Sequence, residues 1–390
     1  MKENNVLNYI KDVLENMPTD WLNLTTHRLD IYNESLAKTQ FLEQFESLFN
    51  TNNSESSALN ELPTAYDYIR LGHPLSSVLE WVIAKLQHLK PENVISFSSQ
   101  TVPVLAILRK NLFDNKNTQI VYTDALPTCF DAEVIQRIYG YKFELKKVDK
   151  AAAISEFNGS TIFISQQDEI NTMDLNPNID FFINIYEHLG STLLVNGEQN
   201  ESYISDIQHV RRRETIAITP ANALAALKSL ITPSSFKRIK DNVATNKKQV
   251  LDTINTITGT NTKALVASSG LSIQYAILMG LIHDAIEKHK GKAIKIVVPP
   301  NCYGGTNDQA RRVAACIDHV AVVDLPVDGD NDMVKSIDTV LAEIAKEDAI
   351  PYIIAEIPTN PRVEVPNLIQ LKEVLSRKRN TETGEIAINP

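Results

Sequence analysis

From about residue 61 onward, short apolar runs alternate with longer helix-like segments, and this alternation restricts the fold more than any other feature. Four runs lie in the first half of the chain, at 94–97, 119–122, 161–165 and 191–196. Four more lie in the second half, at 264–267, 293–298, 319–325 and 352–355. Strands that alternate with helices form mostly parallel sheets with helices on both faces. The sequence therefore predicts an α/β fold.

The two series of runs resemble each other. Val94–Gln100 (VISFSSQ) and Ala264–Gly270 (ALVASSG) are apolar runs that end in a pair of serines, and they begin about 170 residues apart. Helix-like segments follow them, Thr101–Leu112 and Leu271–Lys288. We interpret this pattern as an internal duplication. The alternative is that two unrelated α/β segments resemble each other by their class alone.

The first 60 residues have a different pattern. Leu7, Ile10 and Val13 recur at helical spacing, and so do Leu42 and Phe45. A polar stretch at 50–57 (NTNNSESS) has the composition of a loop. We therefore expect three parts along the chain: an N-terminal helical arm at 1–60, one module at 61–235 and a second module at 236–390.

Composition excludes several classes of function. The 390 residues carry a formal net charge of -10, which argues against a nucleic-acid or anionic-membrane partner. Three cysteines form no CxxC pair and have no histidines at zinc-ligand spacing, so we expect no metal and a reducing compartment. The N-terminus has no signal-peptide apolar core, and no apolar run approaches the ~20 residues of a membrane helix. We expect a cytoplasmic protein.

Three short motifs in the second half carry the chemistry. In the first, Ser268–Leu271 (SSGL), a glycine stands between an expected strand and a long expected helix. Such a junction directs backbone N–H groups at one point, where the helix dipole favours an anion. Gly270 has no side chain to keep a phosphate from the backbone. Taken alone, the segment also fits a plain tight turn.

The second motif, Tyr303–Thr306 (YGGT), follows a strand that ends in two prolines. Ligands of open α/β sheets bind at the carboxyl ends of strands, where a tyrosine ring on a glycine-rich loop can stack on a flat cofactor. The third motif, Glu356–Pro361 (EIPTNP), also follows a strand, and its two prolines favour an extended path that presents Asn360. The alternatives are a turn with a surface tyrosine and a proline-stiffened loop.

In this order and spacing, the three motifs resemble the transsulfuration family of pyridoxal-phosphate (PLP) enzymes, which includes cystathionine synthases, cystathionine lyases and methionine γ-lyase. The family pattern is a Ser-Gly-Met turn, a Tyr-Gly-Gly-Thr loop and a Glu-x-Pro-x-Asn-Pro loop. The resemblance implies that the backbone of Ser269, Gly270 and Leu271 holds the PLP phosphate. It implies that Tyr303 stacks on the pyridine ring and takes part in proton transfer, and that Asn360 lies near the O3′ oxygen. Leu271 replaces the usual methionine.

A fourth match lies upstream, in Tyr66–Glu80, which is similar to the family's Tyr-x-Arg-x-x-Asn-Pro-Thr-x-x-x-Leu-Glu. The resemblance implies that Tyr68 and Arg70 reach across a subunit interface to the phosphate of a neighbouring chain, in a homodimer or homotetramer. Arginine suits this role because it binds phosphate through two hydrogen bonds. His73 and Leu75 depart from the pattern. The alternative for Arg70 is a surface ion pair.

The corresponding segments of the first half lack the motif residues. Ser98–Gln100 has no glycine, Thr123–Thr128 has neither the tyrosine nor the paired glycines, and Ile164–Gln167 stands in place of the glutamate–proline loop. We therefore interpret 61–235 as a degenerate module and 236–390 as the front part of a PLP-binding module. The resemblance implies the large domain of a PLP transferase of fold type I, like that of aspartate aminotransferase, duplicated and incomplete.

PLP enzymes also need a Schiff-base lysine, and in this fold an acidic partner for the pyridine nitrogen. In the family both lie beyond the Asn-Pro loop, and this chain ends before either would occur. Lys228 lacks the family's Ser-x-Thr context, and we expect it on a helix surface. The resemblance thus implies a carbon–sulfur lyase or γ-replacement synthase whose 390 residues are inactive alone. A non-catalytic pseudoenzyme or regulatory subunit is the alternative. A nucleotide-binding α/β protein would show a GxGxxG or Walker sequence, and neither is found.

Overall fold

The computed structural model describes residues 2–23, 34–63, 65, 66, 68–123, 125–167, 170, 175–232, 243–260, 262–327, 332–360 and 362–390. Contacts divide the chain into two units. Unit 1 comprises 1–131 and 142–269, and unit 2 comprises 132–141 and 270–390. The module boundary expected at 235/236 lies outside the described residues, and the division by contacts falls at Gly270 instead.

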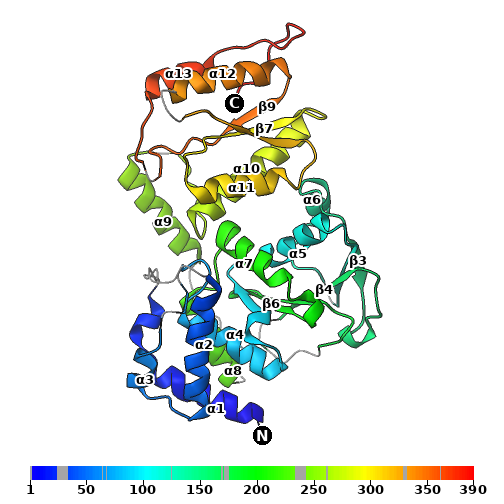
Figure 1. Ribbon diagram of the computed structural model, residues 1–390, viewed down its shortest axis with the longest axis vertical. Coiled ribbons are helices and arrows are strands. Elements are labelled where there is room, and N and C mark those ends of the chain that lie inside the picture. Colours follow the sequence, from blue (N-terminus) through cyan, green and yellow to red (C-terminus); the bar gives the residue numbers. More distant parts are fainter. Residues whose placement is uncertain are drawn as a thin grey trace. The chain divides into compact units, whose positions relative to one another are not determined.

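Unit 1 is a six-stranded sheet with helices around it (Figure 1). The strands are β1 (Val94–Phe97), β2 (Thr118–Tyr122), β3 (Glu144–Lys147), β4 (Ser160–Gln166), β5 (Phe181–Tyr186) and β6 (Gly190–Val195). The helices are α1 (Lys2–Asn16), α2 (Glu34–Asn50), α3 (Ser56–Asn60), α4 (Pro74–Gln87), α5 (Val102–Phe113), α7 (Tyr203–Glu214), α8 (Pro220–Ile231) and α9 (Val243–Thr258). The expected class, mixed α/β, is confirmed.

The strand order of this sheet is β1-β6-β5-β4-β2-β3. Strands β2 to β5 pair in parallel, whereas β6 runs antiparallel to both β5 and β1. On one face, Val121, Phe163 and Phe182 contribute to a core shared with α1, α2, α4 and α8. On the other face, the ring of Phe181 lies 4.8 Å from that of Tyr203 in α7. Because successive residues of a strand point to opposite faces, the sheet is covered by helices on both sides.

The expected N-terminal helices are present as α1 and α2, and they are built into unit 1. Ile10, Val13 and Phe45 are fully buried, in one core with α4 and α8. The ring of Phe45 meets Trp81 of α4 edge-on at 5.2 Å. Helices α1 and α2 therefore supply a layer of the core of unit 1.

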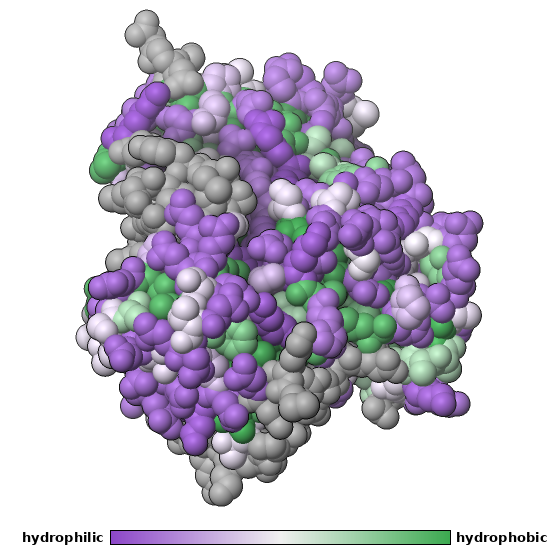
Figure 2. Space-filling view, turned by 60° about the horizontal axis from the view of Figure 1, so that its bottom comes forward, coloured by the Kyte–Doolittle hydropathy of each residue, from purple (hydrophilic) through white to green (hydrophobic). Residues whose placement is uncertain are grey.

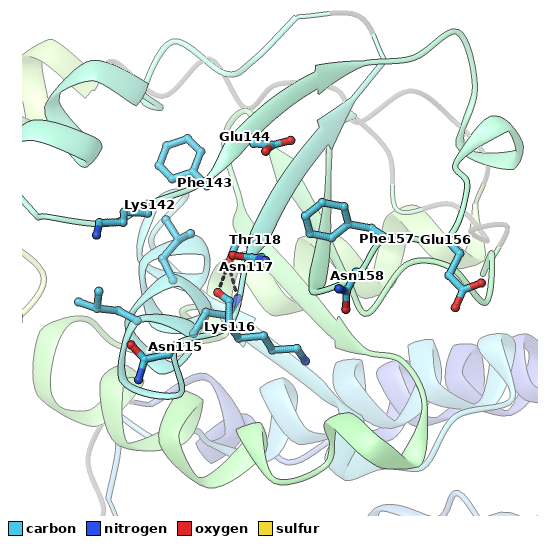
Figure 3. A pocket seen from close by; sticks show the side chains of 13 residues that line it. Asn115, Lys116, Asn117, Thr118, Lys142, Phe143, Glu144, Glu156, Phe157 and Asn158 are labelled. Carbon is cyan, nitrogen blue, oxygen red and sulfur yellow. Dashed lines mark hydrogen bonds between the residues drawn. The ribbon is translucent and has the colours of Figure 1, made fainter.

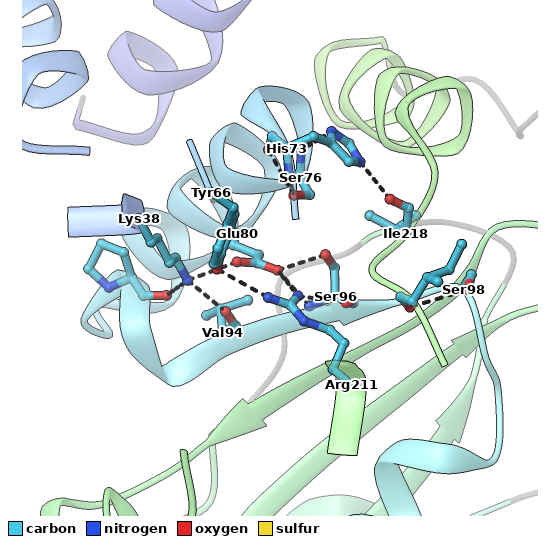
Figure 4. A network of polar contacts seen from close by, with 12 residues as sticks. Lys38, Tyr66, His73, Ser76, Glu80, Val94, Ser96, Ser98, Arg211 and Ile218 are labelled. Carbon is cyan, nitrogen blue, oxygen red and sulfur yellow. Dashed lines mark hydrogen bonds and ion pairs between the residues drawn. The ribbon is translucent and has the colours of Figure 1, made fainter. Parts of the chain in front are cut away.

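A buried carboxylate, Glu80 of α4, connects three distant segments (Figure 4). It forms ion pairs of 2.8 Å with Lys38 of α2 and with Arg211 of α7. It also accepts hydrogen bonds from the backbone N–H and the hydroxyl of Ser96 in β1, at 2.8 and 2.7 Å. Burial disfavours its ionised form, but the charges of Lys38 and Arg211 outweigh this effect and lower the pKa of Glu80 to about 2. Glu80 is therefore ionised at neutral pH.

Unit 2 has three layers (Figure 1). Its sheet is β7 (Ile294–Val298), β8 (Val320–Asp324) and β9 (Ile350–Ile353), all parallel, in the order β8-β7-β9. Helices α10 (Gly270–Lys288) and α11 (Gly304–Ala314) lie on one face, and α12 (Met333–Lys346) and α13 (Leu368–Ser376) on the other. The α12–α13 core contains Ile337, Leu341 and Leu371.

A segment of the first half of the chain belongs to unit 2. It is residues 132–141, which include α6 (Ala132–Arg137). Arg137 forms an ion pair with Glu287 of α10, and the ring of Tyr139 lies 6.5 Å from that of Tyr275. Nothing in the sequence pattern indicated that α6 belongs to unit 2.

The two sheets share one topology. In unit 1, α5 precedes β2, which pairs in parallel with β3 on one side and β4 on the other. In unit 2, α10 precedes β7, which pairs in the same way with β8 and β9. The orders β3-β2-β4 and β8-β7-β9 are therefore the same. This correspondence agrees with an internal duplication.

The strand predicted at Ala264–Ala267 is wrong. These residues have no regular structure, and Leu265 and Val266 are 67% and 42% exposed. The corresponding strand β1 is held by pairing with β6, and the described part of unit 2 contains no counterpart of β6. A strand without a partner leaves its backbone groups unsatisfied, so the segment stays irregular. The other seven predicted strands are present within a few residues, and β3 and β5 were not predicted.

No helix in the described part of the chain combines the length and the apolar character that a membrane span requires. Figure 2 shows one face of the molecule, on which hydrophilic residues predominate and hydrophobic residues are scattered among them. No group of three His, Cys, Asp or Glu side chains that could hold a metal ion occurs among the described residues.

We predict that Glu80→Ala lowers the free energy of unfolding by about 3–5 kcal/mol, because it leaves two buried cations without a counter-charge. The measurement is urea denaturation at neutral pH. The control is Glu201→Ala, which breaks an exposed pair with Lys90, whose side chain is 60% exposed, and should cost less than about 1 kcal/mol. Equal losses in the two variants would contradict the role given to Glu80.

Candidate functional site

The second and third sequence motifs meet at one side chain in unit 2. That side chain is Glu356, which lies just beyond β9, and its Oε2 accepts the backbone N–H of Tyr303 at 2.8 Å and that of Asn360 at 3.2 Å. The Tyr303 loop follows β7 and the Asn360 loop follows β9, and these strands are paired neighbours. Both loops therefore lie at the carboxyl edge of the sheet, where open α/β folds bind ligands.

A second tie joins the same two loops. The amide of Asn301, two residues before Tyr303, donates to Glu364 at 3.1 Å. The buried Thr359 organises the Asn360 loop itself, because its hydroxyl accepts the backbone N–H of Glu364 at 2.9 Å and its own N–H donates to the Glu364 carbonyl at 3.1 Å. Asn360 is exposed at the turn that these bonds close.

The first motif lies beside the second. Helix α10 begins at Gly270, and α11 begins at Gly304 with Tyr303 as its N-cap. The Thr306 hydroxyl donates to Gln274 at 3.2 Å, and the buried amide of Gln309 donates to the Leu271 carbonyl at 2.9 Å. The first two turns of α10 and α11 are thus bonded to each other. The N-terminus of each helix favours negative charge beside it.

The surroundings of Gly270 are open. A Cβ built on this residue would have no atom within 4 Å, and the same is true of Gly304. The fold therefore does not require glycine at either position for packing. The open space leaves the backbone at the start of both helices accessible to a ligand.

Glu356 also affects its neighbour Cys302. Burial, and to a smaller extent the charge of Glu356, raises the pKa of the Cys302 thiol next to Tyr303. The Tyr303 side chain is half-buried and Glu356 is partly exposed. No lysine is among the residues that these hydrogen bonds join. Chemically, the residues offer a helix N-terminus for an anion, an aromatic ring and a side-chain amide.

The upstream pair lies in unit 1. The guanidinium of Arg70 is 4.4 Å from the centre of the Tyr68 ring, and that of Arg212 in α7 is 4.7 Å from it. The Arg70 carbonyl accepts the N–H of Ala217 at 2.9 Å. Arg212 was not identified from the sequence, where only its place in a run of three arginines was visible. The phosphate role of Tyr68 and Arg70 stays a prediction.

The corresponding positions of unit 1 carry other residues. Ser99 caps α5 by accepting the N–H of Val102 at 3.1 Å, and the Gln100 amide donates to the Tyr186 carbonyl at 3.0 Å. Strand pairing aligns Ser160 with Thr118, as it aligns Ile350 with Ile294. Counted from these residues, Gln166 corresponds to Glu356 and Pro127 to Tyr303.

Two cavities lie away from these residues. One, of about 710 Å³, is in unit 1, between the end of α5 and the starts of β2 and β3, and includes Lys116, Thr118 and Phe143 (Figure 3). The other, of about 430 Å³, is in unit 2 near the end of α10 and includes Lys292 and His319. Both open at the amino edge of a sheet, at corresponding places. Their repetition indicates that the architecture itself produces them.

Lys228 lies exposed on α8, as expected for a helix-surface lysine.

No protein-family model matches the chain, and no curated protein matches it. Solved structures do resemble it. One is metB from Corynebacterium glutamicum, at 13% identity over 64% of this chain and 69% of that chain, with a TM-score of 0.34. Another is a cystathionine gamma synthase from Xanthomonas oryzae pv. oryzae in complex with aminoacrylate and cysteine, at 13% identity over 49% and 59%, with a TM-score of 0.31.

A third is a putative O-acetylhomoserine (thiol)-lyase (metY) from Campylobacter jejuni, at 14% identity over 64% and 75%, with a TM-score of 0.30. That structure contains N'-pyridoxyl-lysine-5'-monophosphate at position 205 of its own chain. The chain is thus similar to structures of the kind that its motifs indicated.

We predict that Gly270→Ala leaves the melting temperature unchanged or raises it, because Gly270 has open surroundings and alanine favours a helix by up to about 1 kcal/mol. The matched control in unit 2 is Gly140→Ala. Gly140 has φ of 73°, and its Cβ would lie 2.9 Å from the Cys316 carbonyl oxygen, so the melting temperature should fall. A comparable fall for Gly270→Ala would mean that the fold, rather than a ligand, requires this glycine.

Proposed function

We propose that unit 2 binds pyridoxal 5'-phosphate at the carboxyl edge of its sheet. The observation that carries the proposal is the pair of hydrogen bonds from Tyr303 and Asn360 to one oxygen of Glu356. These bonds bring together two loops whose residues match the family motifs. Hydrogen bonds between the first two turns of α10 and α11 link the first motif, at the start of α10, to the loop of the second.

The residues present fit the cofactor. The backbone N–H groups at Ser269, Gly270 and Leu271 would hold the phosphate, helped by the dipole of α10 and by the open space around Gly270. Tyr303 would stack on the pyridine ring. The exposed amide of Asn360 would donate a hydrogen bond to the phenolic oxygen of the cofactor. Tyr68 and Arg70 of a neighbouring chain would supply a second set of phosphate contacts in a homodimer or homotetramer.

The proposed activity is that of a carbon–sulfur lyase or a γ-replacement synthase in sulfur amino-acid metabolism, in the cytoplasm. It also needs a Schiff-base lysine, which the residues of this site do not supply. The substrate would be cysteine, homocysteine or an activated homoserine. When bound, PLP stabilises negative charge on the substrate carbon next to the amino group. The chain's own contribution would be to orient the ring between Tyr303 and the sheet edge and to move a proton at the Tyr303 hydroxyl.

Unit 1 supports a second candidate function. Its corresponding loops carry Gln166 and Pro127 in place of Glu356 and Tyr303. Its six-stranded sheet and its buried core are nevertheless present. A fold kept without these side chains is what a pseudoenzyme or regulatory subunit would need. In that case unit 2 would sense the cofactor without catalysis.

We predict that Tyr303→Ala weakens the binding of pyridoxine 5'-phosphate about tenfold, because the lost ring contact is worth about 0.5–1.5 kcal/mol beyond its buried area. This probe keeps the ring and the phosphate but lacks the aldehyde, which would react with surface lysines. Isothermal titration calorimetry gives the dissociation constant.

The matched control is Thr128→Ala in the corresponding loop of unit 1, which should leave the dissociation constant unchanged. Inorganic phosphate serves as a second ligand, and its affinity should be the same for Tyr303→Ala and the unsubstituted protein. Equal weakening of pyridoxine 5'-phosphate by both substitutions, or no binding to the unsubstituted protein, would overturn the proposed cofactor.

A further inference from the structure

Glu356 lies just beyond β9, and one of its carboxylate oxygens accepts hydrogen bonds from two loops. The donors, Tyr303 and Asn360, are separated by 57 positions and are held by the same Oε2 at 2.8 and 3.2 Å. Hydrogen bonds from backbone N–H groups to a carboxylate are about twice as strong as neutral ones. The side chain therefore fixes the distance between the two loops.

The carboxylate acts from a rigid base. The Ile354 N–H, two residues before Glu356, still pairs with the Val297 carbonyl of β7 at 3.0 Å. On the other side, the Tyr303 carbonyl accepts the N–H of Thr306 at 2.8 Å in the first turn of α11. The backbone of Tyr303 is thus held at its N–H by the Glu356 side chain and at its carbonyl by the first turn of α11. These two bonds fix the position of the backbone from which the Tyr303 ring extends.

Unit 1 offers an internal comparison. Gln166 occupies the corresponding position. It lies six residues after Ser160, the partner of Thr118, and Glu356 lies six residues after Ile350, the partner of Ile294. Gln166 is exposed and uncharged. The charged acceptor and the motif residues Tyr303 and Asn360 therefore occur together in unit 2, and all three differ in unit 1.

We infer that Glu356 is a positioning residue, which orders the Tyr303 and Asn360 loops so that a pyridoxyl ring and its phenolic oxygen meet both side chains at once. This inference rests on the proposed function. Glu356 itself would touch neither the ring nor the phosphate. The two N–H groups would partly neutralise its negative charge. A carboxylate without such donors would repel an anionic ligand beside it.

The test compares Glu356→Ala and Glu356→Gln with Glu373→Gln, a control on the exposed surface of α13. Hydrogen exchange of the Tyr303 and Asn360 amides reports the loop order without any ligand. Calorimetry with pyridoxine 5'-phosphate reports the site. In Glu356→Ala both amides should exchange about tenfold faster and the dissociation constant should rise about tenfold, as expected for the loss of hydrogen bonds to a charged group. Glu356→Gln, whose amide oxygen still accepts, should fall between.

The outcomes separate the inference from the proposed function. Unchanged exchange in Glu356→Ala would overturn the inference, whatever the affinity. Faster exchange with unchanged affinity would also overturn it and would leave the proposed cofactor intact. Tighter binding by Glu356→Gln would show that charge repulsion outweighs positioning, which contradicts the inference. If the unsubstituted protein does not bind the probe, the proposed function fails, and the inference fails with it even where exchange is faster.

Discussion

The ion pairs of Glu80 are the interaction on which unit 1 depends. This fully buried carboxylate has Lys38 and Arg211 as partners, from helices far apart in the sequence, and it also accepts two hydrogen bonds from Ser96 in the edge strand β1. A buried ion pair is costly to form and more costly to break on one side only. The pairing therefore specifies which helices cover this end of the sheet, and it makes the N-terminal residues part of the unit.

Unit 2 uses a carboxylate in a different way. Glu356 is partly exposed and accepts hydrogen bonds from backbone N–H groups. It therefore connects two loops, whereas Glu80 connects helices to the sheet. The same parallel arrangement of three strands thus occurs twice, with different side chains at its carboxyl edge. Where unit 1 places Gln166, unit 2 places a charged acceptor that connects Tyr303 and Asn360. The two edges therefore differ in their loop residues, whereas the strands beneath them correspond.

The sequence predicted most of the architecture because buried strands and amphipathic helices leave strong apolar patterns. Strand β1 was located to the residue, and α10 to within one residue. The edge strand β3 was missed because Glu144–Lys147 is exposed and mostly charged, so that only pairing with β2 reveals it. The strand expected at Ala264–Ala267 failed for the opposite reason: its apolar residues have no neighbouring strand to pair with among the residues that the structure describes. Local pattern cannot tell whether a partner exists.

The candidate site was predictable as residues but not as geometry. The motifs named Gly270, Tyr303 and Asn360, whereas the role of Glu356 as the common acceptor of Tyr303 and Asn360 depends on side-chain hydrogen bonds that no spacing reveals. The stacking of Arg212 on Tyr68 was equally hidden, because it joins segments more than a hundred residues apart.

The most direct measurement of the central claim is a crystal structure of the protein with pyridoxine 5'-phosphate. The account predicts that the phosphate oxygens lie about 3 Å from the backbone nitrogens at the start of α10, with the ring against Tyr303. A ligand bound at Ser98–Gln100 of unit 1, or in either amino-edge cavity, would contradict it.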